Sequence, residues 1–574
     1  MTKHLWALLI ALVATLANGA AIAKTRLAEG SGAATVQIAT ARHGMVASQE
    51  REATRIGVDI LQRGGNAVDA AVAVGFALAV TLPKAGNLGG GGFMMVHLAE
   101  SNENVAIDYR ETAPAATTAD IFLGPDGEAD PAKSRDSGLG VGVPGTVAGL
   151  SLALAQFGSG KFTLGDLIAP AVRLAREGIA VKDDLYDSLQ LAQPRLAHWP
   201  ATVRIFLKPD GSVPAASEKL VQGELADTLE AIGQEGTRAF YVGPIADKIV
   251  AAVRDAGGLM TRGDLENYAP VIRNPVYGTY RGHEIVSMPP PSSGGIHLVE
   301  MLNILEGYPS RLIGGGSPAA LHLEIEAMKL AYADRAEFLG DTDRVDVPID
   351  RLISKSYAAT LRQKIDPRRA QPARAISSGV PAGANTTHFS IIDQSGNVVA
   401  NTYSLNFSYG LGLVADGTGI LLNNELDDFA AKPGAPNAYG LVGNAANAPG
   451  AGKRPLSSMT PTIVLKDTKP VLATGAPGGS RIITTVLQVI VNAIDGRMTI
   501  GNAVAAPRLH HQWLPDEVVV EPNFPAPKAH ALAVLGHKLR RDTVFGSAHS
   551  IAVTPEGLVG AADLRSRGAA AAGY

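Results

Sequence analysis

Apolar side chains recur at regular spacing in several parts of the first half of the chain. Residues 49–62 have them three and four positions apart, which predicts a helix with Ser48 as its cap. Residues 67–80 predict a second helix, so rich in Ala and apolar residues that we expect it to be buried. Residues 93–96 and 105–109 are short apolar runs typical of buried strands.

The second half predicts a long helix and a hairpin. The helix begins after Ser317, with Pro at its first turn, and continues to residue 339. Residues 386–393 and 398–405 are strand-like and flank a short polar turn, which predicts a β-hairpin. Residues 367–385 lie directly before it, contain three Pro and three Arg, and show no periodicity. The hairpin is therefore expected to begin immediately behind an exposed, flexible linker.

The N-terminus has the pattern of an export signal. An apolar block at residues 5–16 follows Lys3, and residues 21–23 read Ala-Ile-Ala, which is a typical cleavage site. We therefore expect residues 1–23 to be a signal peptide, with an N-terminal membrane anchor as the alternative. The mature protein is expected in the periplasm, or else secreted, with no stable membrane anchor.

The amino-acid composition excludes several classes of function but says little about the fold. The 574 residues include 64 Gly and no Cys, 46% of them are hydrophobic and 18% are charged, with a net charge of −4. These values exclude a disordered chain, disulfides, thiolate zinc sites and cysteine nucleophiles, and they make nucleic acid an unexpected partner. Length by itself suggests three to four domains.

Common catalytic and cofactor motifs are absent. Residues 158–161 imitate a phosphate loop, but Phe162 stands where Ser or Thr is needed. The four glycines at 89–92 precede a strand rather than a helix, so they predict a tight turn where two backbones approach, not a dinucleotide site. No histidine spacing suits a metal, and no G-x-S-x-G sequence occurs.

A threonine remains as a candidate nucleophile. Thr386 stands at the end of the expected linker and at the start of a strand. If the chain were cut before it, its α-amine, with a pKa of about 7.7–8.0, could accept the proton of its own hydroxyl near neutral pH. From spacing alone, an ordinary strand threonine remains the alternative.

Motifs along most of the chain resemble the γ-glutamyltranspeptidase family. They are Ala-Gly-Asn-Leu-Gly-Gly-Gly-Gly-Phe at 85–93, Asp-Tyr-Arg-Glu at 108–111, Met-Pro-Pro-Pro-Ser-Ser-Gly-Gly at 288–295, Thr-Thr-His-Phe-Ser at 386–390, Asn-Asn-Glu-Leu-Asp-Asp-Phe at 423–429, Pro-Asn-Ala-Tyr-Gly-Leu-Val-Gly at 436–443, Lys-Arg-Pro-Leu-Ser-Ser-Met at 453–459 and Gly-Ala-Pro-Gly-Gly-Ser-Arg at 475–481. Their order and spacing are specific to that family. The resemblance extends from residue 41 to residue 574.

The resemblance implies an α/β fold of the N-terminal-nucleophile hydrolase type, an αββα sandwich with two stacked sheets between helix layers. It also implies a precursor that cuts itself between Asn385 and Thr386. The products would be a large subunit, residues 24–385, and a small subunit, residues 386–574, forming a heterodimer with one shared core. This expectation replaces the several domains suggested by length.

The resemblance also assigns roles to individual residues. Thr386 would be the nucleophile, Ser404 a second hydroxyl beside it, and Gly478 and Gly479 the oxyanion site. The remaining family matches would bind the donor. Arg110, Ser457 and Ser458 would bind its α-carboxylate, and Asn406, Glu425 and Asp428 would bind its α-ammonium group. Residues 436–447, which include Tyr439, would form a lid over the bound donor. No metal and no cofactor are implied.

Three functions are consistent with these residues, two of them enzymatic. The first is transfer of a γ-glutamyl group from glutathione-like small molecules to water, amino acids or dipeptides. The second is a glutaryl-type β-lactam acylase, whose acyl group lacks an α-amine and would leave Asp428 facing no cation. The third is an uncleaved, inactive relative that binds glutamyl compounds, and a single band on a gel would identify it.

Overall fold

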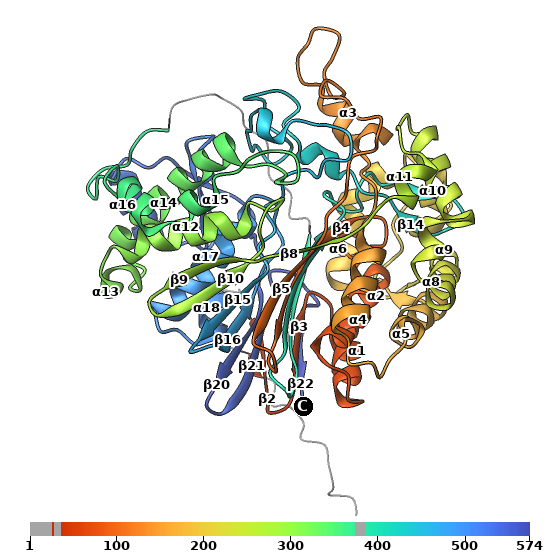
Figure 1. Cartoon of the computed structure of the whole chain (residues 1–574), viewed down its shortest axis with the longest axis horizontal. Helices are drawn as coiled ribbons and strands as arrows, with labels where there is room; N and C mark the ends of the chain where they lie inside the picture. Colours follow the sequence, from red (N-terminus) through yellow and green to blue (C-terminus); the bar gives the residue numbers. More distant parts are fainter. Residues whose placement is uncertain (1–25, 28–35, 374–385) are drawn as a thin grey trace, which may run out of the picture.

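Two antiparallel sheets stacked face to face form the centre of the molecule (Figure 1). The computed structural model describes residues 26–27, 36–373 and 386–574. The first sheet has the strand order β1 (Arg26–Leu27), β2 (Val36–Ala41), β21 (Gly557–Asp563), β20 (His549–Thr554), β16 (Lys469–Thr474), β15 (Thr462–Lys466), β10 (His283–Ser287) and β9 (Val276–Tyr280). The second has the order β22 (Ala570–Gly573), β3 (Met45–Ser48), β11 (Thr387–Ile392), β12 (Val398–Ser404), β4 (Gly91–Leu98), β5 (Glu103–Tyr109) and β8 (Val271–Arg273).

Helices cover the outer face of each sheet, as Figure 1 shows. On the seven-stranded side these are α1 (Arg51–Gln62), α2 (Ala67–Thr81), α4 (Thr146–Phe157), α5 (Leu164–Glu177), α6 (Asp183–Leu196), α7 (Pro200–Phe206), α8 (Gly223–Glu235), α9 (Thr237–Tyr241) and α10 (Pro244–Asp255). On the eight-stranded side they are α12 (Gly294–Glu306), α13 (Ser310–Ile313), α14 (Pro318–Phe338), α15 (Ile349–Leu352), α16 (Lys355–Arg362), α17 (Arg481–Ile494), α18 (Ile500–Ala505) and α19 (Ala526–Val534).

Apolar side chains from both sheets meet between them. Phe93 and Met95 of β4 share one buried cluster with Val286 of β10 and Ile463 of β15. A separate cluster lies between each sheet and its own helices. Three apolar layers between four layers of structure confirm the predicted αββα sandwich.

The seven-stranded sheet combines strands from both sides of the predicted cleavage point. β11 and β12 lie between β3 and β4, so strands after residue 386 are inserted between strands before residue 374. Neither part could bury its apolar faces without the other. The expectation of three to four separate domains is therefore wrong for the described residues.

Most predicted elements are present, with one error at a helix start. The predicted hairpin is β11 and β12, and the long helix is α14, capped by Ser317. The first helix, however, is capped by Glu50, whose side chain accepts from the N–H groups of Glu52 and Ala53. Ser48 instead ends β3 and is hydrogen-bonded to Thr54. The predicted signal peptide and most of the predicted linker lie outside the described residues.

No helix in the described part of the chain is long and apolar enough to cross a membrane.

Candidate active site

The register of the hairpin places two hydroxyl groups side by side. Thr387 pairs with Tyr403, so Thr386 and Ser404 stand opposite each other at the open end of β11 and β12. The Thr386 hydroxyl donates to Ser404 Oγ at 3.3 Å, and the side chain of Thr386 is buried. Ser404 Oγ also accepts from the N–H of Asn406 at 2.9 Å.

The glycine run at 89–92 makes this arrangement possible. A Cβ at Gly90 would lie 2.1 Å from the carbonyl oxygen of Ser404, which only glycine avoids. The Asn87 side chain donates to the same carbonyl at 2.8 Å and accepts from the N–H of Gly90 at 3.0 Å. The predicted close approach of two backbones is confirmed, and it supports the strand end that carries Ser404. The predicted tight turn is wrong, because Gly89 pairs with Leu422 in a β-bridge and Gly91 and Gly92 begin β4.

A small pocket opens at Thr386, and most of the predicted site residues line it. Its lining is Thr386, Ser404, Asn406, Glu425, Asp428, Tyr439, Leu441, Ser457, Ser458, Met459, Gly479, Ser480 and Ile482. Gly478 is the neighbour of Gly479 in the chain, and Arg110 reaches the pocket through Glu425 and Asp428. The fold therefore brings together residues that are more than 300 positions apart.

The charged side of the pocket consists of Arg110, Glu425 and Asp428. Arg110 is fully buried; its guanidinium donates to Glu425, and to Asp428 at 2.6 Å. Its Nε donates to the carbonyl of Pro455 at 3.1 Å. The cation expected to bind a carboxylate and the anions expected to bind an ammonium group thus pair with one another here, and the buried Glu111 carboxylate lies 3.8 Å from the same guanidinium.

Burial changes the acidity of these groups. It raises the pKa of Glu425 to about 7, against the lowering effect of Arg110. Burial likewise raises the pKa of Asp428. Burial would lower the pKa of Arg110, but the neighbouring Glu425 and Asp428 raise it, so the guanidinium stays charged.

Neither Ser457 nor Ser458 donates a side-chain hydrogen bond to another described residue, so both hydroxyl protons are available to a ligand. Ser457 Oγ accepts from the N–H of Met459 at 3.1 Å, and Ser458 Oγ accepts from Arg335 Nη2 at 3.4 Å. Since each oxygen is engaged as an acceptor, each hydroxyl can donate elsewhere. Arg335, buried on α14, was not predicted from the sequence, where it is one more polar position in a long helix.

Residues 478–480, the glycine loop, form the second half of the connection between β16 and α17. Gly478 and Gly479 have φ values of 133° and 56°, and their N–H groups donate no hydrogen bond within the described chain. A Cβ at Gly479 would lie 2.6 Å from the ring of Tyr439. Two free N–H groups at the start of a helix are a suitable site for a developing negative charge.

The lid, residues 436–447, lies against this loop. The Tyr439 hydroxyl donates to Asn406, with distances of 2.9 Å to its carbonyl oxygen and 2.7 Å to Oδ1. Asn437 donates to Asp428 Oδ1 at 3.1 Å and accepts from the N–H of Tyr439 at 3.0 Å. The lid is therefore closed over the pocket and linked to its charged side.

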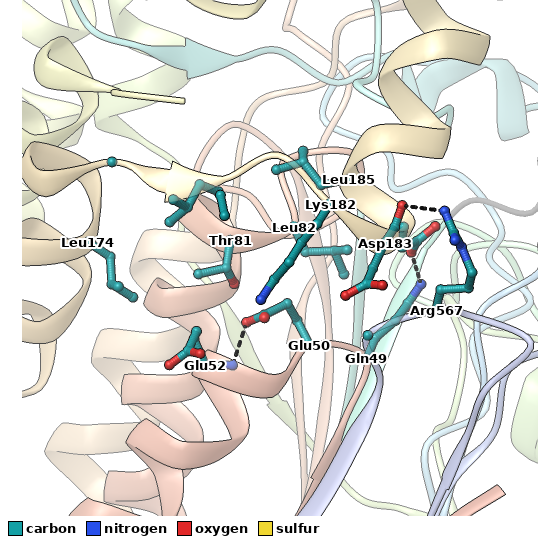
Figure 2. Close-up of a pocket in the computed structure, with 15 residues that line it drawn as sticks. Gln49, Glu50, Glu52, Thr81, Leu82, Leu174, Lys182, Asp183, Leu185 and Arg567 are labelled. Carbon is teal, nitrogen blue, oxygen red and sulfur yellow. Dashed lines mark hydrogen bonds between the residues drawn. The ribbon is translucent and has the colours of Figure 1, made fainter. Parts of the chain in front are cut away.

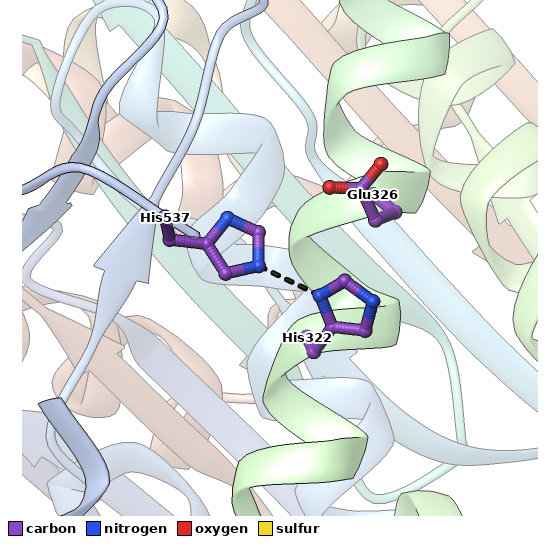
Figure 3. Close-up of side chains that lie close together, drawn as sticks. All are labelled: His322, Glu326 and His537. Atoms are coloured by element: carbon purple, nitrogen blue, oxygen red, sulfur yellow. Dashed lines mark hydrogen bonds between the residues drawn. The ribbon is translucent and has the colours of Figure 1, made fainter. Parts of the chain in front are cut away.

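Two further polar features contain none of the predicted site residues. A cavity of about 230 Å³ lies between α1, the end of α2 and the start of α6. Figure 2 shows Glu50, Lys182 and Asp183 among its lining side chains. Figure 3 shows His322, Glu326 and His537, buried on α14 and near β19 (Leu539–Arg541).

Most polar atoms of the histidine cluster already have partners, although the buried His537 Nδ1 has none within the described residues. His322 Nδ1 and His537 Nε2 share a hydrogen bond of 2.7 Å, and His322 Nε2 lies 2.8 Å from the carbonyl of Asp366. Lys329 donates to Glu326 at 2.9 Å, so this carboxylate already has a cation. A metal ion would have to break both interactions.

Solved structures with the same architecture define the class. The structure of cephalosporin acylase from Bacillus halodurans matches with a TM-score of 0.83 and 28% identity, covering 95% of this chain and 98% of that one. The Helicobacter pylori γ-glutamyltranspeptidase structure matches with a TM-score of 0.55 and 40% identity, covering 62% of this chain and 95% of that one. The fold, together with the buried Thr386 directly before β11, defines the class of N-terminal-nucleophile hydrolases.

Sequence comparison defines the family. The profile described as Gamma-glutamyltranspeptidase matches residues 53–573. The glutathione hydrolase proenzyme of Escherichia coli (strain K12) is 51% identical over 539 residues, 93% of this chain and 92% of that protein. Acylase ACY 1 proenzyme of Pseudomonas sp. (strain V22) is 38% identical over 545 residues, covering 92% and 93%. The chain belongs to the γ-glutamyltranspeptidase family.

Proposed function

We propose that this protein is a γ-glutamyl transferase and hydrolase. It cleaves the γ-glutamyl bond of glutathione and related small molecules and passes the γ-glutamyl group to water, amino acids or dipeptides. The charged side of the pocket carries this proposal, because Arg110, Glu425 and Asp428 suit a ligand with both a carboxylate and an ammonium group.

A zwitterion can enter this ion-paired network without leaving a buried charge alone. Its carboxylate binds Arg110 and the two serine hydroxyls, and its ammonium group lies against Glu425 and Asp428. Each charge lost from the internal pairs is replaced by one from the ligand. A glutaryl group would bring only a carboxylate, which adds negative charge beside two buried acids. The similarity to acylases keeps glutaryl transfer as the second candidate.

The reaction proceeds through an ester on Thr386. Its Oγ attacks the γ-carbonyl carbon while its α-amine takes the hydroxyl proton. The N–H groups of Gly478 and Gly479 stabilise the resulting oxyanion. When the amide bond breaks, the proton goes to the leaving amine and a γ-glutamyl–threonyl ester remains. Water or an acceptor amine then attacks the ester, and Thr386 regains its proton.

The α-amine of Thr386 becomes free by self-cleavage of the Asn385–Thr386 bond. This gives the large subunit, residues 24–385, and the small subunit, residues 386–574, which stay together because their strands alternate in one sheet. Thr386 has a φ of 108°, which is unusual for a β-branched residue. Cleavage removes the peptide bond that defines this angle, so it releases the strain. Export to the periplasm by a signal peptide, residues 1–23, completes the proposal.

The test is amine release from a γ-glutamyl anilide by the purified protein, with and without glycylglycine. Release without acceptor that becomes faster with acceptor is the expected result. A protein that consists of two chains but releases amine only from a glutaryl anilide would contradict the γ-glutamyl assignment. A single uncleaved chain without activity would indicate an inactive binding protein.

A further inference from the structure

Gln512 connects two parts of the pocket that are far apart in the sequence. Its Nε2 donates to the carbonyl oxygen of Tyr439 in the lid at 2.9 Å and to that of Leu514 at 3.2 Å. Its Oε1 accepts from the hydroxyl of Ser480 in the glycine loop at 2.7 Å and lies 2.9 Å from His510 Nε2. All four hydrogen-bonding positions of this half-buried amide are therefore used.

These contacts fix the orientation of the amide. The carbonyl oxygens of Tyr439 and Leu514 can only accept, so Gln512 Nε2 must face them and Gln512 Oε1 must face His510 Nε2, which therefore carries the proton that Oε1 accepts. The Thr484 hydroxyl lies 2.9 Å from His510 Nδ1 and 3.1 Å from the carbonyl of Arg481. Burial lowers the pKa of His510 to about 3, so the imidazole stays neutral. Rotating the amide by 180° would place its oxygen against two carbonyl oxygens. Gln512 can therefore satisfy the lid and the glycine loop in only one way.

The lid and the glycine loop, which Gln512 connects, also contact each other directly. The ring of Tyr439 covers Gly479, where a Cβ would lie 2.6 Å from it. The carbonyl of Ser480 accepts from the hydroxyl of Tyr332, which leaves the Ser480 side chain to Gln512. A shift of the lid and a shift of the glycine loop are thus coupled through one side chain.

We propose that Gln512 is a positioning residue that aligns the glycine loop with the closed lid. The inference rests on the proposed γ-glutamyl transfer. The acceptor half of the amide holds Ser480 and with it the N–H groups of Gly478 and Gly479, so it affects the rate of the chemical step. The donor half holds the carbonyl of Tyr439, so it affects how well the lid excludes water from the ester on Thr386.

Two substitutions separate these halves. Gln512→Met removes all four hydrogen bonds; at about 1 kcal/mol each for the two of the acceptor half, to Ser480 and His510, we expect kcat to fall about tenfold or more with donor KM within about threefold. Loss of the one bond to the lid, at Tyr439, should lower its ratio of transfer to hydrolysis at fixed glycylglycine about fivefold. Gln512→Glu can still accept from Ser480 and His510 but, when ionised, cannot donate to Tyr439. It should keep kcat within about threefold and show the same fall in the ratio.

Gln488 offers a matched control. It is a buried glutamine on α17 whose Nε2 donates to the carbonyls of Thr484 at 2.7 Å and Leu509 at 2.8 Å, with no contact to the lid. Once the Gln488→Met precursor has cleaved itself, its kcat and its ratio of transfer to hydrolysis should lie within about threefold of the wild-type values. Equal losses in Gln488→Met and Gln512→Met would overturn the proposal, because they would indicate general loss of packing.

The remaining outcomes are also decisive. If the Gln512→Met precursor does not cleave itself, the test rests on Gln512→Glu. An unchanged ratio of transfer to hydrolysis in Gln512→Glu then overturns the proposal. If the wild-type protein shows no γ-glutamyl release, the proposed function fails, and amide hydrogen exchange of the lid then tests Gln512 separately. Faster exchange of residues 436–447 in Gln512→Glu than in wild type and Gln488→Met supports the connection, and equal exchange contradicts it.

Discussion

The two sides of the pocket are held by different forces. On the charged side, Arg110 is buried between the carboxylates of Glu425 and Asp428. On the opposite side, neutral hydrogen bonds through Gln512 and the Tyr439 hydroxyl join the lid to the glycine loop and to Asn406, while only the start of the lid, at Asn437 and Ala438, contacts carboxylates. Removing one member of a buried ion pair leaves the other uncompensated, whereas a neutral bond contributes only about 1 kcal/mol.

This difference suits the two tasks. The charged side must recognise a zwitterion, and strong, fixed charges discriminate between a ligand with an ammonium group and one without it. The lid must open and close in each turnover, and weak neutral contacts allow this at little cost. Substitutions on the charged side should therefore change which donor is used, and substitutions at the lid should change where the γ-glutamyl group goes.

Both sides depend on Thr386, so its loss has the largest expected effect. Thr386→Ala removes the hydroxyl that attacks both the precursor peptide bond and the donor. We expect one uncleaved chain on a denaturing gel and no detectable amine release. Ser404→Ala is the matched control, because it removes the neighbouring hydroxyl and should leave some cleavage. A cleaved, active Thr386→Ala protein would refute the assignment of the nucleophile.

The next largest effect is expected on the charged side. Asp428→Asn removes a charged partner of the donor ammonium group, and such an interaction contributes about 1.5–3 kcal/mol. We expect kcat/KM for a γ-glutamyl anilide to fall about 10- to 100-fold. Hydrolysis of a glutaryl anilide should change less, because that substrate has no ammonium group. Equal losses on both substrates would argue against the ammonium-binding role.

A smaller change is expected at the lid. Tyr439→Phe removes the hydroxyl that donates to Asn406 but keeps the ring over Gly479. Loss of one neutral hydrogen bond of about 1 kcal/mol predicts a fall of about fivefold in the ratio of transfer to hydrolysis, with kcat/KM for the donor nearly unchanged. A loss in donor kcat/KM as large as that of Asp428→Asn would erase the distinction between the two sides.

The sequence predicted contacts inside motifs better than contacts between them. The family resemblance placed Ser404 beside Thr386, and the hairpin predicted from the sequence is the element that brings the two together in the structure. The family resemblance supplied the residues of the charged side, although not that Arg110 would be paired with its neighbours. Arg335 and Gln512 were missed, because each acts through one side chain brought in by packing of a distant element. Neither lies in a motif that spacing could reveal.

The charged side should also give a pH signature that the lid does not. Burial raises the pKa of Glu425 to about 7, so this carboxyl gains a proton, and with it loses its attraction for an ammonium group, as the pH falls through that value. The Thr386 amine, with a pKa of about 7.7–8.0, must also be unprotonated to act as base. Below about pH 6, log kcat/KM for the donor should therefore rise with a slope of about two per pH unit.

Glu425→Gln removes one of these two titrations and keeps an oxygen that can accept a hydrogen bond. The slope should fall to about one, while kcat/KM at pH 8 falls about 10- to 100-fold, because the neutral amide, like the protonated carboxyl, lacks the charge that attracts the ammonium group. Tyr439→Phe is the control from the lid, and its profile should keep the wild-type slope. A slope of two in Glu425→Gln would assign the second titration to another group, and a slope of one in wild type would mean that Glu425 is already ionised below pH 6.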